Sequence, residues 1–322
     1  IRDLVRSRGL GDVYKRQIRN NFLNLKRIVG GNVKILAAVK ADAYGHGMIE
    51  ISRVLLECGA DYFGVGTTDE AIRLRRLYRL IPILSLGPAA RRDIVPIINC
   101  KIAQGIGDIS FAKALNKEAE RRNQKAKVHI KVDTGMGRFG VWHNDAVSFI
   151  KKVKALKFID IEGIYTHFPC AENDKTYTSR QIRDFGRLID ELHKNSIGIK
   201  YKHVANSAAL INYKDSHLNM VRPGLIIYGL YPDLSLKDKI KLTPALSLKS
   251  RILFIKDIPP NQRISYGATY VTKSHSRIAI IPIGYGDGYS RLLSNRGEVI
   301  ICLLYTSPSP RDRTRSRMPS SA

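Results

Sequence analysis

The sequence contains few cysteines and no long apolar run, and each shortage excludes a class of protein. The four cysteines are far apart, so their spacing matches neither a zinc site nor a disulfide framework; they are Cys58, Cys100, Cys170 and Cys302. The longest apolar runs are much shorter than the roughly 18 residues that a membrane-spanning helix needs. The basic start is not followed by the apolar stretch and cleavage site of a secretory signal. We therefore expect a cytoplasmic protein with no metal centre and no membrane partner.

Acidic residues are also scarce, with 28 Asp and Glu against 54 Lys and Arg in 322 residues and a formal net charge of +26. Such a surplus raises nucleic acid as a partner. The basic residues, however, are spread over expected helices such as 116–127 and 151–157 and over both ends, without interleaved aromatics, which favours a solvated surface. We therefore expect no nucleic-acid partner. A hydrophobic fraction of 44% and a mean hydropathy of −0.18 are those of an ordinary globular protein with a full core.

The two ends of the chain differ in texture from the rest. Residues 1–17 and 303–322 show neither helical nor strand periodicity, and the chain does not begin with Met. Both segments resemble peptides translated from adapter DNA joined to a gene fragment, and a pair of disordered basic tails is the alternative. We therefore expect a non-native leader at 1–17, a native region at 18–302 and a non-native basic tail at 303–322.

From residue 33 onward, short apolar runs alternate with amphipathic segments, the pattern of repeated strand–helix units. The pattern predicts an α/β protein with a (β/α)8 barrel of the TIM type at 18–235, with a doubly wound sheet as the alternative. The expected strands are 33–40, 62–66, 81–86, 102–106, 127–132, 159–165, 201–205 and 219–222, and the clearest helices are 48–58, 69–78 and 179–195.

The texture changes after Pro232. Strand-like segments at 245–255, 277–283 and 298–301 are joined by turn signals, with no helical pattern between them. We expect a second, mostly β domain at 236–302 that stops abruptly at its end.

Polar residues of unusual type follow several of the expected barrel strands. Lys40 ends the first strand, His167 follows the sixth, Arg222 ends the eighth, and Arg138 and Ser207 lie in the loops after the fifth and seventh. Each has an ordinary explanation, such as a lysine reaching to solvent or a helix cap. Because barrel enzymes build their sites from the C-terminal ends of strands, the joint placement favours an active site.

Lys40 is the strongest candidate in this set. It follows an apolar strand, and desolvation there lowers the pKa of an amine toward neutrality. A deprotonated lysine is a nucleophile that condenses with carbonyls, including the aldehyde of pyridoxal 5'-phosphate.

The string VKADAYGHG at 39–47 resembles the cofactor-lysine motif of the alanine racemases. Further matching stretches cover nearly all of 18–302; they are 131–138, 165–168, 205–208, 221–224, 265–270 and 284–288. The resemblance implies a fold-type III pyridoxal-phosphate enzyme that interconverts L- and D-alanine and supplies D-alanine for peptidoglycan. It also implies a homodimer with shared active sites.

By the same resemblance, Lys40 binds pyridoxal 5'-phosphate covalently. The Tyr44 and Ser207 hydroxyls and the backbone N–H groups of Gly224 and Leu225 would hold its phosphate, which suits a helix start with free N–H donors.

The resemblance places Arg222 at the pyridine nitrogen, with His167 behind it. A guanidinium does not give up its proton, so the ring nitrogen would stay unprotonated and the cofactor would be a weaker electron sink. We expect this to limit side reactions and to favour return of the proton.

Racemisation needs a base on each face of the substrate carbon. The resemblance assigns these bases to Lys40 and to Tyr266 from the neighbouring subunit. Arg138 would bind the substrate carboxylate, Lys131 matches a lysine that is carbamylated in many relatives, and Tyr285 would line the access route to the substrate site.

Other assignments stay open at this point. A serine or lysine racemase on the same scaffold is the nearest alternative. Decarboxylases of basic amino acids usually carry an acidic residue where Arg222 stands, and single-domain pyridoxal-phosphate carriers lack Tyr266 and the segment 236–302. The glycines of 284–288 follow no strand–helix pattern, so they predict no nucleotide site. Family members also continue well past Cys302 and begin with a strand that 1–17 does not resemble, so an inactive truncated fragment is a further alternative.

Overall fold

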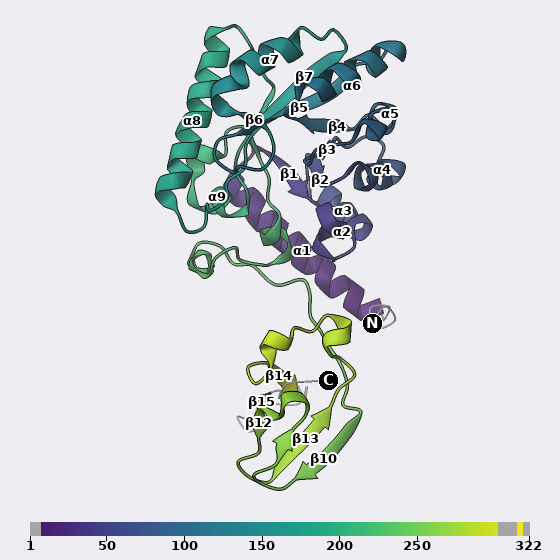
Figure 1. Ribbon diagram of the computed structural model, residues 1–322, viewed down its shortest axis with the longest axis vertical. Coiled ribbons are helices and arrows are strands. Elements are labelled where there is room, and N and C mark those ends of the chain that lie inside the picture. Colours follow the sequence, from purple (N-terminus) through teal and green to yellow (C-terminus); the bar gives the residue numbers. More distant parts are fainter. Residues whose placement is uncertain (1–7, 302–313, 318–322) are drawn as a thin grey trace. The chain divides into compact units, whose positions relative to one another are not determined.

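The computed structural model describes residues 8–301 and 314–317 of the chain (Figure 1). The chain divides into unit 1, Ile1–Leu246, and unit 2, Ser247–Ala322. The sequence places the end of the barrel domain earlier, at 235. Residues beyond 235 pack on unit 1 because Leu236, Ile240 and Leu242 are buried in its core.

Unit 1 is a nearly closed parallel barrel. Its strand order is β8-β7-β5-β4-β3-β2-β1-β9, and each neighbouring pair is parallel. The end strands meet where the Arg222 N–H donates to the Ala205 carbonyl at 2.9 Å. The expected (β/α)8 barrel is therefore confirmed, and the doubly wound sheet is excluded.

All eight expected barrel strands are present. They are β1 (Lys34–Ala38), β2 (Tyr62–Val65), β3 (Ile83–Ser85), β4 (Ala103–Ile106), β5 (Ala126–Asp133), β7 (Ile159–Tyr165), β8 (Tyr201–His203) and β9 (Met220–Val221). The two-residue β6 (Val141–Trp142) was not expected; it pairs with the end of β5.

Helices alternate with these strands and cover the barrel. They are α1 (Arg8–Val29), α3 (Met48–Glu57), α4 (Thr68–Leu77), α5 (Ile94–Asn99), α6 (Ile109–Arg121), α7 (Ala146–Lys154), α8 (Lys175–Lys194) and α9 (Ser207–Asn212). The helix expected at 116–127 ends earlier, because Asn123 has a left-handed φ of 50° and β5 begins at Ala126. Likewise, α7 ends before residue 157.

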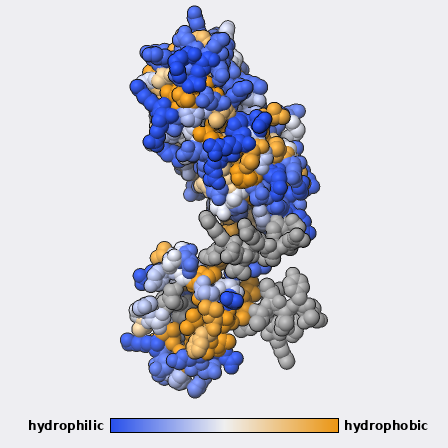
Figure 2. All heavy atoms as spheres, turned by 90° about the vertical axis from the view of Figure 1, so that its right-hand side faces the viewer, coloured by the Kyte–Doolittle hydropathy of each residue, from blue (hydrophilic) through white to orange (hydrophobic). Residues whose placement is uncertain are grey.

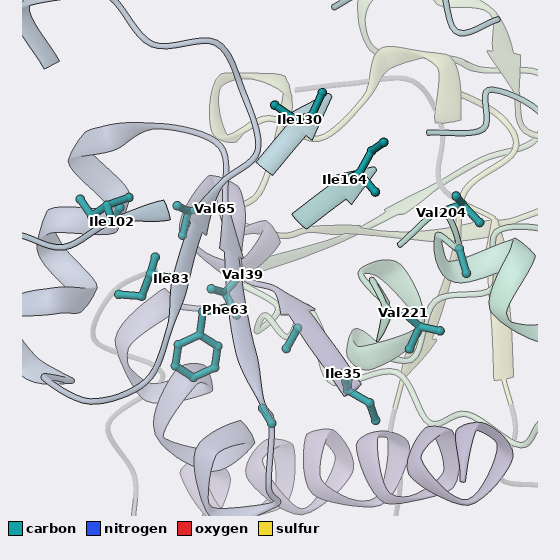
Figure 3. Packing of buried hydrophobic residues seen from close by; sticks show 14 of the residues in the cluster. Ile35, Val39, Phe63, Val65, Ile83, Ile102, Ile130, Ile164, Val204 and Val221 are labelled. Atoms are coloured by element: carbon teal, nitrogen blue, oxygen red, sulfur yellow. The ribbon is translucent and has the colours of Figure 1, made fainter. Parts of the chain in front are cut away.

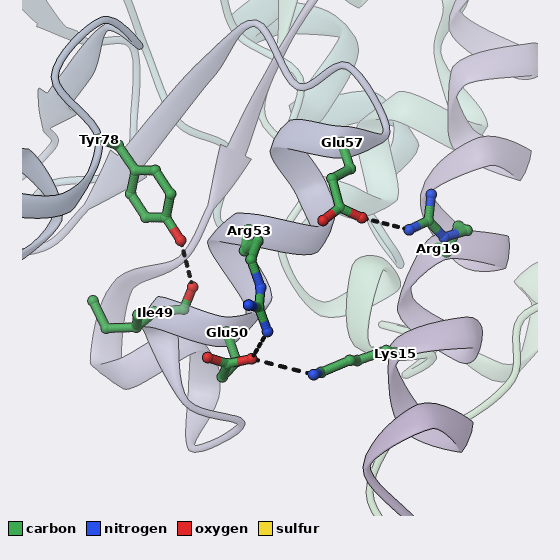
Figure 4. A network of polar contacts seen from close by, with 7 residues as sticks. All are labelled: Lys15, Arg19, Ile49, Glu50, Arg53, Glu57 and Tyr78. Carbon is green, nitrogen blue, oxygen red and sulfur yellow. Dashed lines mark hydrogen bonds and ion pairs between the residues drawn. The ribbon is translucent and has the colours of Figure 1, made fainter.

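Helix α1 corrects the expectation for the start of the chain. Residues 8–17 are helical, although that segment was expected to lack regular structure. Lys15 pairs with Glu50 at 3.2 Å and Arg19 with Glu57 at 2.6 Å, which ties α1 to α3 (Figure 4). Residues 1–7, 302–313 and 318–322 lie outside the described part, so the origin of both ends stays a prediction.

The barrel strands bury side chains on both faces. A large cluster between strands and helices includes Ile35, Phe63 and Ile130 (Figure 3). Alternate residues, such as Leu36 and Tyr62, belong to a second cluster that fills one side of the interior. On the other side, the interior positions of β5, β7 and β8 are polar; they include His129, Lys131, Tyr165 and His203. The apolar outer cluster stabilises the barrel, and the polar inner half is available for chemistry.

Unit 2 consists of short antiparallel pairs. β10 (Phe254–Ile258) pairs with β13 (Ser276–Ile280), and β11 (Arg263–Ile264) pairs with β12 (Tyr270–Val271). β14 (Glu298–Ile301) pairs with β15 (Thr314–Arg317), which corrects the expected lack of strand structure for 314–317. Apolar side chains gather on this unit in Figure 2, and Leu253, Phe254 and Ile255 are exposed.

The strand expected at 245–255 is wrong over most of its length. The regular strand begins only at Phe254, and at the start of the expected range the Ala245 N–H donates instead to the Tyr228 carbonyl at 3.0 Å. The expected strand 277–283 likewise ends as β13 at Ile280, shortly before Pro282.

Candidate active site

Lys40 lies at the C-terminal end of β1, at the start of the segment labelled α2 (Lys40–Tyr44). The four residues that follow it, 41–44, have left-handed φ angles of 52°, 51°, 56° and 55°. The Ala43 N–H donates to the Val39 carbonyl at 2.9 Å, and Asp42 Oδ1 accepts the Met48 N–H at 3.0 Å. A left-handed turn thus presents Lys40 and Tyr44 together at the rim.

The Lys40 amine is partly buried among cations. Burial lowers the pKa of Lys40, and the positive charges of Arg138 and Arg222 lower it further. The lowered pKa makes it easier for the Lys40 amine to lose its proton and become a nucleophile. Lys40, Arg138 and Arg222 are therefore close enough to interact electrostatically.

Tyr44, Ser207 and Gly224 form an anion-binding corner beside this lysine. The Gly224 N–H donates to Ser207 Oγ at 2.9 Å. A Cβ atom on Gly224 would lie 2.7 Å from the Tyr44 hydroxyl, so glycine is required for this close approach. Leu225 opens the short helix η5 (Leu225–Tyr228), and its N–H has no partner within that helix. The Tyr44 and Ser207 hydroxyls and the Gly224 backbone therefore meet in one small space.

Arg222 is buried and its guanidinium is held from behind. Nη1 donates to the His203 carbonyl at 2.6 Å, and Nη2 donates to the carbonyls of Thr166 at 2.6 Å and Val204 at 3.1 Å. Nε–H makes no hydrogen bond with the described residues and is available for a ligand. Burial lowers the pKa of Arg222 to about 10, so the side chain remains a cation at neutral pH.

Two histidines contact this arginine. His167 was predicted, and its Nδ1 lies 3.4 Å from Arg222 Nη2. His203 was missed, yet its Nδ1 lies closer, 3.0 Å from Nη1. Burial and the nearby Arg222 charge hold the pKa of both imidazoles well below the usual value. The available signal for His203 was its place within an expected strand.

Lys131 and Arg138 lie on and after β5. Lys131 is buried, and burial together with the Arg222 charge lowers its pKa to about 7. Asp133 accepts backbone N–H groups of Gly135, Gly137 and Arg138, at 2.8, 3.1 and 3.0 Å. Burial alone would raise the pKa of Asp133, but these bonds outweigh it and lower the pKa. Asp133 thereby shapes the loop that carries the exposed Arg138.

Tyr266 and Tyr285 belong to unit 2. They open the short helices η7 (Tyr266–Ala268) and η8 (Tyr285–Asp287), with exposed fractions of 72% and 54%. The structure therefore brings together the predicted barrel residues, while the roles of these two tyrosines stay predictions.

A parallel barrel with a desolvated lysine, a glycine-walled anion corner and a buried arginine at one rim defines an enzyme suited to an anionic carbonyl cofactor. The chain matches the family model of the alanine racemase N-terminal domain over residues 13–232 and that of the C-terminal domain over 245–303. It belongs to the alanine racemase family, which confirms the resemblance found in the sequence. The first match begins inside the segment 1–17.

Individual relatives agree with this assignment. The chain is 45% identical over 287 residues to the alanine racemase of Methanococcus maripaludis, covering 88% of this chain and 77% of that protein. It is 46% identical over 282 residues to that of Halothermothrix orenii, covering 87% and 74%. The alanine racemase structure of Clostridium difficile 630 matches with a TM-score of 0.82 at 39% identity, covering 89% and 75%. That of Bacillus anthracis with bound L-Ala-P matches at 0.80 and 34%, covering 89% and 75%.

The family depends on pyridoxal phosphate. The chain spans about three quarters of the length of these relatives. None of the helices in the described residues is both long and apolar enough to cross a membrane.

Proposed function

We propose that this chain interconverts L- and D-alanine with pyridoxal 5'-phosphate bound at the barrel rim. The observation that carries the proposal is the site around Lys40, where a desolvated amine, an anion-binding corner and a buried guanidinium face one another. When bound, the cofactor draws electrons from the substrate and acidifies its Cα proton.

The residues present fit this cofactor. The absence of a Cβ on Gly224 would leave room for a phosphate, which the Tyr44 and Ser207 hydroxyls and the N–H groups of Gly224 and Leu225 would bind. Lys40 would bind the aldehyde covalently. The free Nε–H of Arg222 would donate to the pyridine nitrogen and, because a guanidinium retains its proton, would not protonate it. His167 supports this arginine from behind.

Lys40 and Tyr266 would act as the two proton carriers. Lys40, once displaced by substrate, would take or return the Cα proton on one face, since its lowered pKa makes the unprotonated amine more accessible. Tyr266 of a second copy would serve the opposite face. The exposed position of Tyr266 and the exposed apolar residues of β10 support a homodimer with shared sites.

Arg138 would bind the substrate carboxylate, with Asp133 fixing its loop. Lys131, whose pKa of about 7 leaves much of the amine neutral, is suited to carbamylation. The modification would turn a cation beside Arg138 and Arg222 into an anion and relieve their repulsion. Tyr285 would line the access route to the substrate. A cytoplasmic location and a supply of D-alanine for peptidoglycan complete the proposal.

The test starts from the purified full chain. We expect a pyridoxal-phosphate absorbance band, and borohydride reduction should attach the cofactor to the peptide that contains Lys40. Lys40→Ala should abolish both this attachment and racemisation in either direction. Lys113→Ala, on the exposed face of α6, is the matched control and should retain both. Racemisation by Lys40→Ala at the wild-type rate would refute the mechanism.

A further inference from the structure

Two buried histidines lie end to end behind Arg222. His203 Nδ1 is 3.0 Å from Arg222 Nη1, and His203 Nε2 is 2.8 Å from His129 Nδ1. His203 comes from β8 and His129 from β5, and both side chains are fully buried in the polar half of the barrel interior. We call His129 and His203 the two-histidine bridge.

The far end of the two-histidine bridge is a carboxylate. Glu162 of β7 places Oε2 at 3.5 Å from His129 Nε2 and at 2.8 Å from the Tyr62 hydroxyl, and its Oε1 lies 2.8 Å from Lys127 Nζ. Burial alone would raise the pKa of Glu162, but the nearby His129 ring and hydrogen bonds from Lys127 and Tyr62 outweigh it and lower the pKa to about 2. Glu162 is therefore ionised at neutral pH.

Arg222 at one end and Glu162 at the other allow only one arrangement of the protons on His203 and His129. A guanidinium only donates hydrogen bonds, a carboxylate only accepts them, and a neutral imidazole does one of each. His203 must therefore accept at Nδ1 and donate from Nε2. His129 must then accept at Nδ1 and direct its proton from Nε2 toward Glu162. A further proton on Nδ1 of either ring would make two N–H groups face each other, with no acceptor between them.

The surroundings hold both rings in place. A Cβ atom on Gly163 would overlap the His129 ring, so glycine lets the imidazole lie against β7. The Tyr165 ring stacks on His203 with centroids 5.0 Å apart and planes 5° apart. Arg222 itself contacts no carboxylate in the described part of the chain, so Glu162 supplies a negative charge that reaches it through the two rings.

We propose that Glu162, acting through the two-histidine bridge, is a positioning residue that sets the charge and orientation of the Arg222 guanidinium. This deepens the proposed racemase function and rests on it. The carboxylate draws each proton of the bridge toward itself, which makes His203 Nδ1 a stronger acceptor. A stronger acceptor holds the Arg222 N–H groups behind the site and keeps the guanidinium a cation that orients the cofactor ring without protonating it.

The experiment measures proton positions and turnover in the holoenzyme with ¹⁵N-labelled histidine. In the wild type, both rings should be neutral and carry the proton on Nε2 at neutral pH. Glu162→Gln removes the charge and offers His129 an amide donor as well as an oxygen, so the far end of the bridge no longer fixes one order of protons. We expect the rings to lose their uniform Nε2 protonation and kcat to fall about 10-fold in both directions, as for other supporting residues around a site, with a smaller change in KM.

Tyr62→Phe is the matched control, because it removes one hydrogen bond to Glu162 and leaves the carboxylate charge. It should keep the wild-type proton positions and a kcat within about 2-fold of the wild type. Equal losses of kcat in the two variants without any change of tautomer would overturn the proposal. So would wild-type proton positions and turnover in Glu162→Gln.

If Glu162→Gln does not fold, the ¹⁵N-histidine spectrum of the wild-type holoenzyme tests the proposal by itself. A doubly protonated ring, or a proton on Nδ1 of His129 or His203 at neutral pH, would overturn it without any variant. A wild-type protein that shows the expected tautomers but does not racemise alanine would refute the proposed function instead.

Discussion

The candidate site brings several cationic side chains together, and lysine and arginine respond differently to burial there. Lys40 and Lys131 have lowered pKa values because an amine can lose its proton when burial and neighbouring charges make the cation costly. Arg222 is as deeply buried, yet it stays charged. The same barrel interior thus holds two amines that lose their protons more easily than usual and one guanidinium that remains a cation.

Lys131 makes the stability of unit 1 depend on pH. Its pKa falls from 10.5 to about 7 on folding, so the unfolded chain holds a proton that the folded chain has lost between these values. The free energy of unfolding should therefore rise with pH in this window, by up to about 1.4 kcal/mol per pH unit. Lys131→Met should remove this contribution. Urea unfolding of both proteins in bicarbonate-free buffer measures the difference, and parallel pH profiles would contradict the shifted pKa.

Gly224 tests the anion-binding corner at the level of one atom. Gly224→Ala places a Cβ 2.7 Å from the Tyr44 hydroxyl, which must move away. We expect the affinity for pyridoxal 5'-phosphate to fall about 10-fold or more, a loss of at least about 1.4 kcal/mol. Fluorescence titration with the cofactor measures it. Gly186→Ala in α8 is the control, since a Cβ there meets nothing within 4 Å; equal affinities in the two variants would count against the corner as the phosphate site.

At the scale of elements, strand β5 shows how one segment serves two purposes. Val128, Ile130 and Val132 pack outward into the large apolar cluster, and His129, Lys131 and Asp133 point to the other face. This alternation can be read in the sequence. Lys131, however, was identified through the family resemblance. His129 was missed, although this alternation was the available signal for it.

The turn after β1 is the most strained element around the site. Four successive non-glycine residues, 41–44, have left-handed backbone angles, each costing about 1 kcal/mol or more. The strain is tolerated because the turn delivers Lys40 and Tyr44 to the same space, and Asp42 and Val39 hold it with hydrogen bonds.

Relief of this strain is measurable at the exposed Ala41. Ala41→Gly removes the Cβ clash but adds freedom to the unfolded chain, so we expect a gain of a few tenths to about 1 kcal/mol in the free energy of unfolding. Ala114→Gly, in the right-handed helix α6, should instead lose about 1 kcal/mol. Denaturant unfolding compares the two. Losses of similar size in both would mean that the turn is not strained.

At the scale of the whole molecule, the proposed active site needs residues of both units. Lys40 belongs to unit 1 and Tyr266 to unit 2. If Tyr266 serves the site of a second copy, two inactive variants can restore one site between them.

Co-expression of Lys40→Ala and Tyr266→Phe tests this sharing. A mixed dimer then contains one site with both Lys40 and Tyr266, so statistical pairing should recover about a quarter of wild-type racemisation. Each variant alone should be nearly inactive. Activity of the mixture no higher than that of the separate variants would show that the two residues do not meet across a dimer.

Much of the fold followed from periodicity. All eight barrel strands lie within a few residues of their expected places, because buried parallel strands are short apolar runs between glycine, proline and helical segments. The prediction of a strand at 245–255 was wrong because an apolar run does not indicate which of the two units it packs on. Leu242 and Ala245 belong to the core of unit 1. For α1, the segment before residue 18 carries many basic residues, which hid a helix that covers the barrel.

By itself the sequence determined the order of strands and helices, the family and Lys40 as the candidate cofactor lysine, because these depend on local pattern and on contiguous motifs. Only the tertiary structure decided that Arg222 is held by Thr166 and His203, that Gly224 meets Tyr44, and that Glu162 reaches Arg222 through the two-histidine bridge. These contacts join residues far apart in the chain. Closure of the barrel brings them within hydrogen-bond distance, and burial then shifts their pKa values.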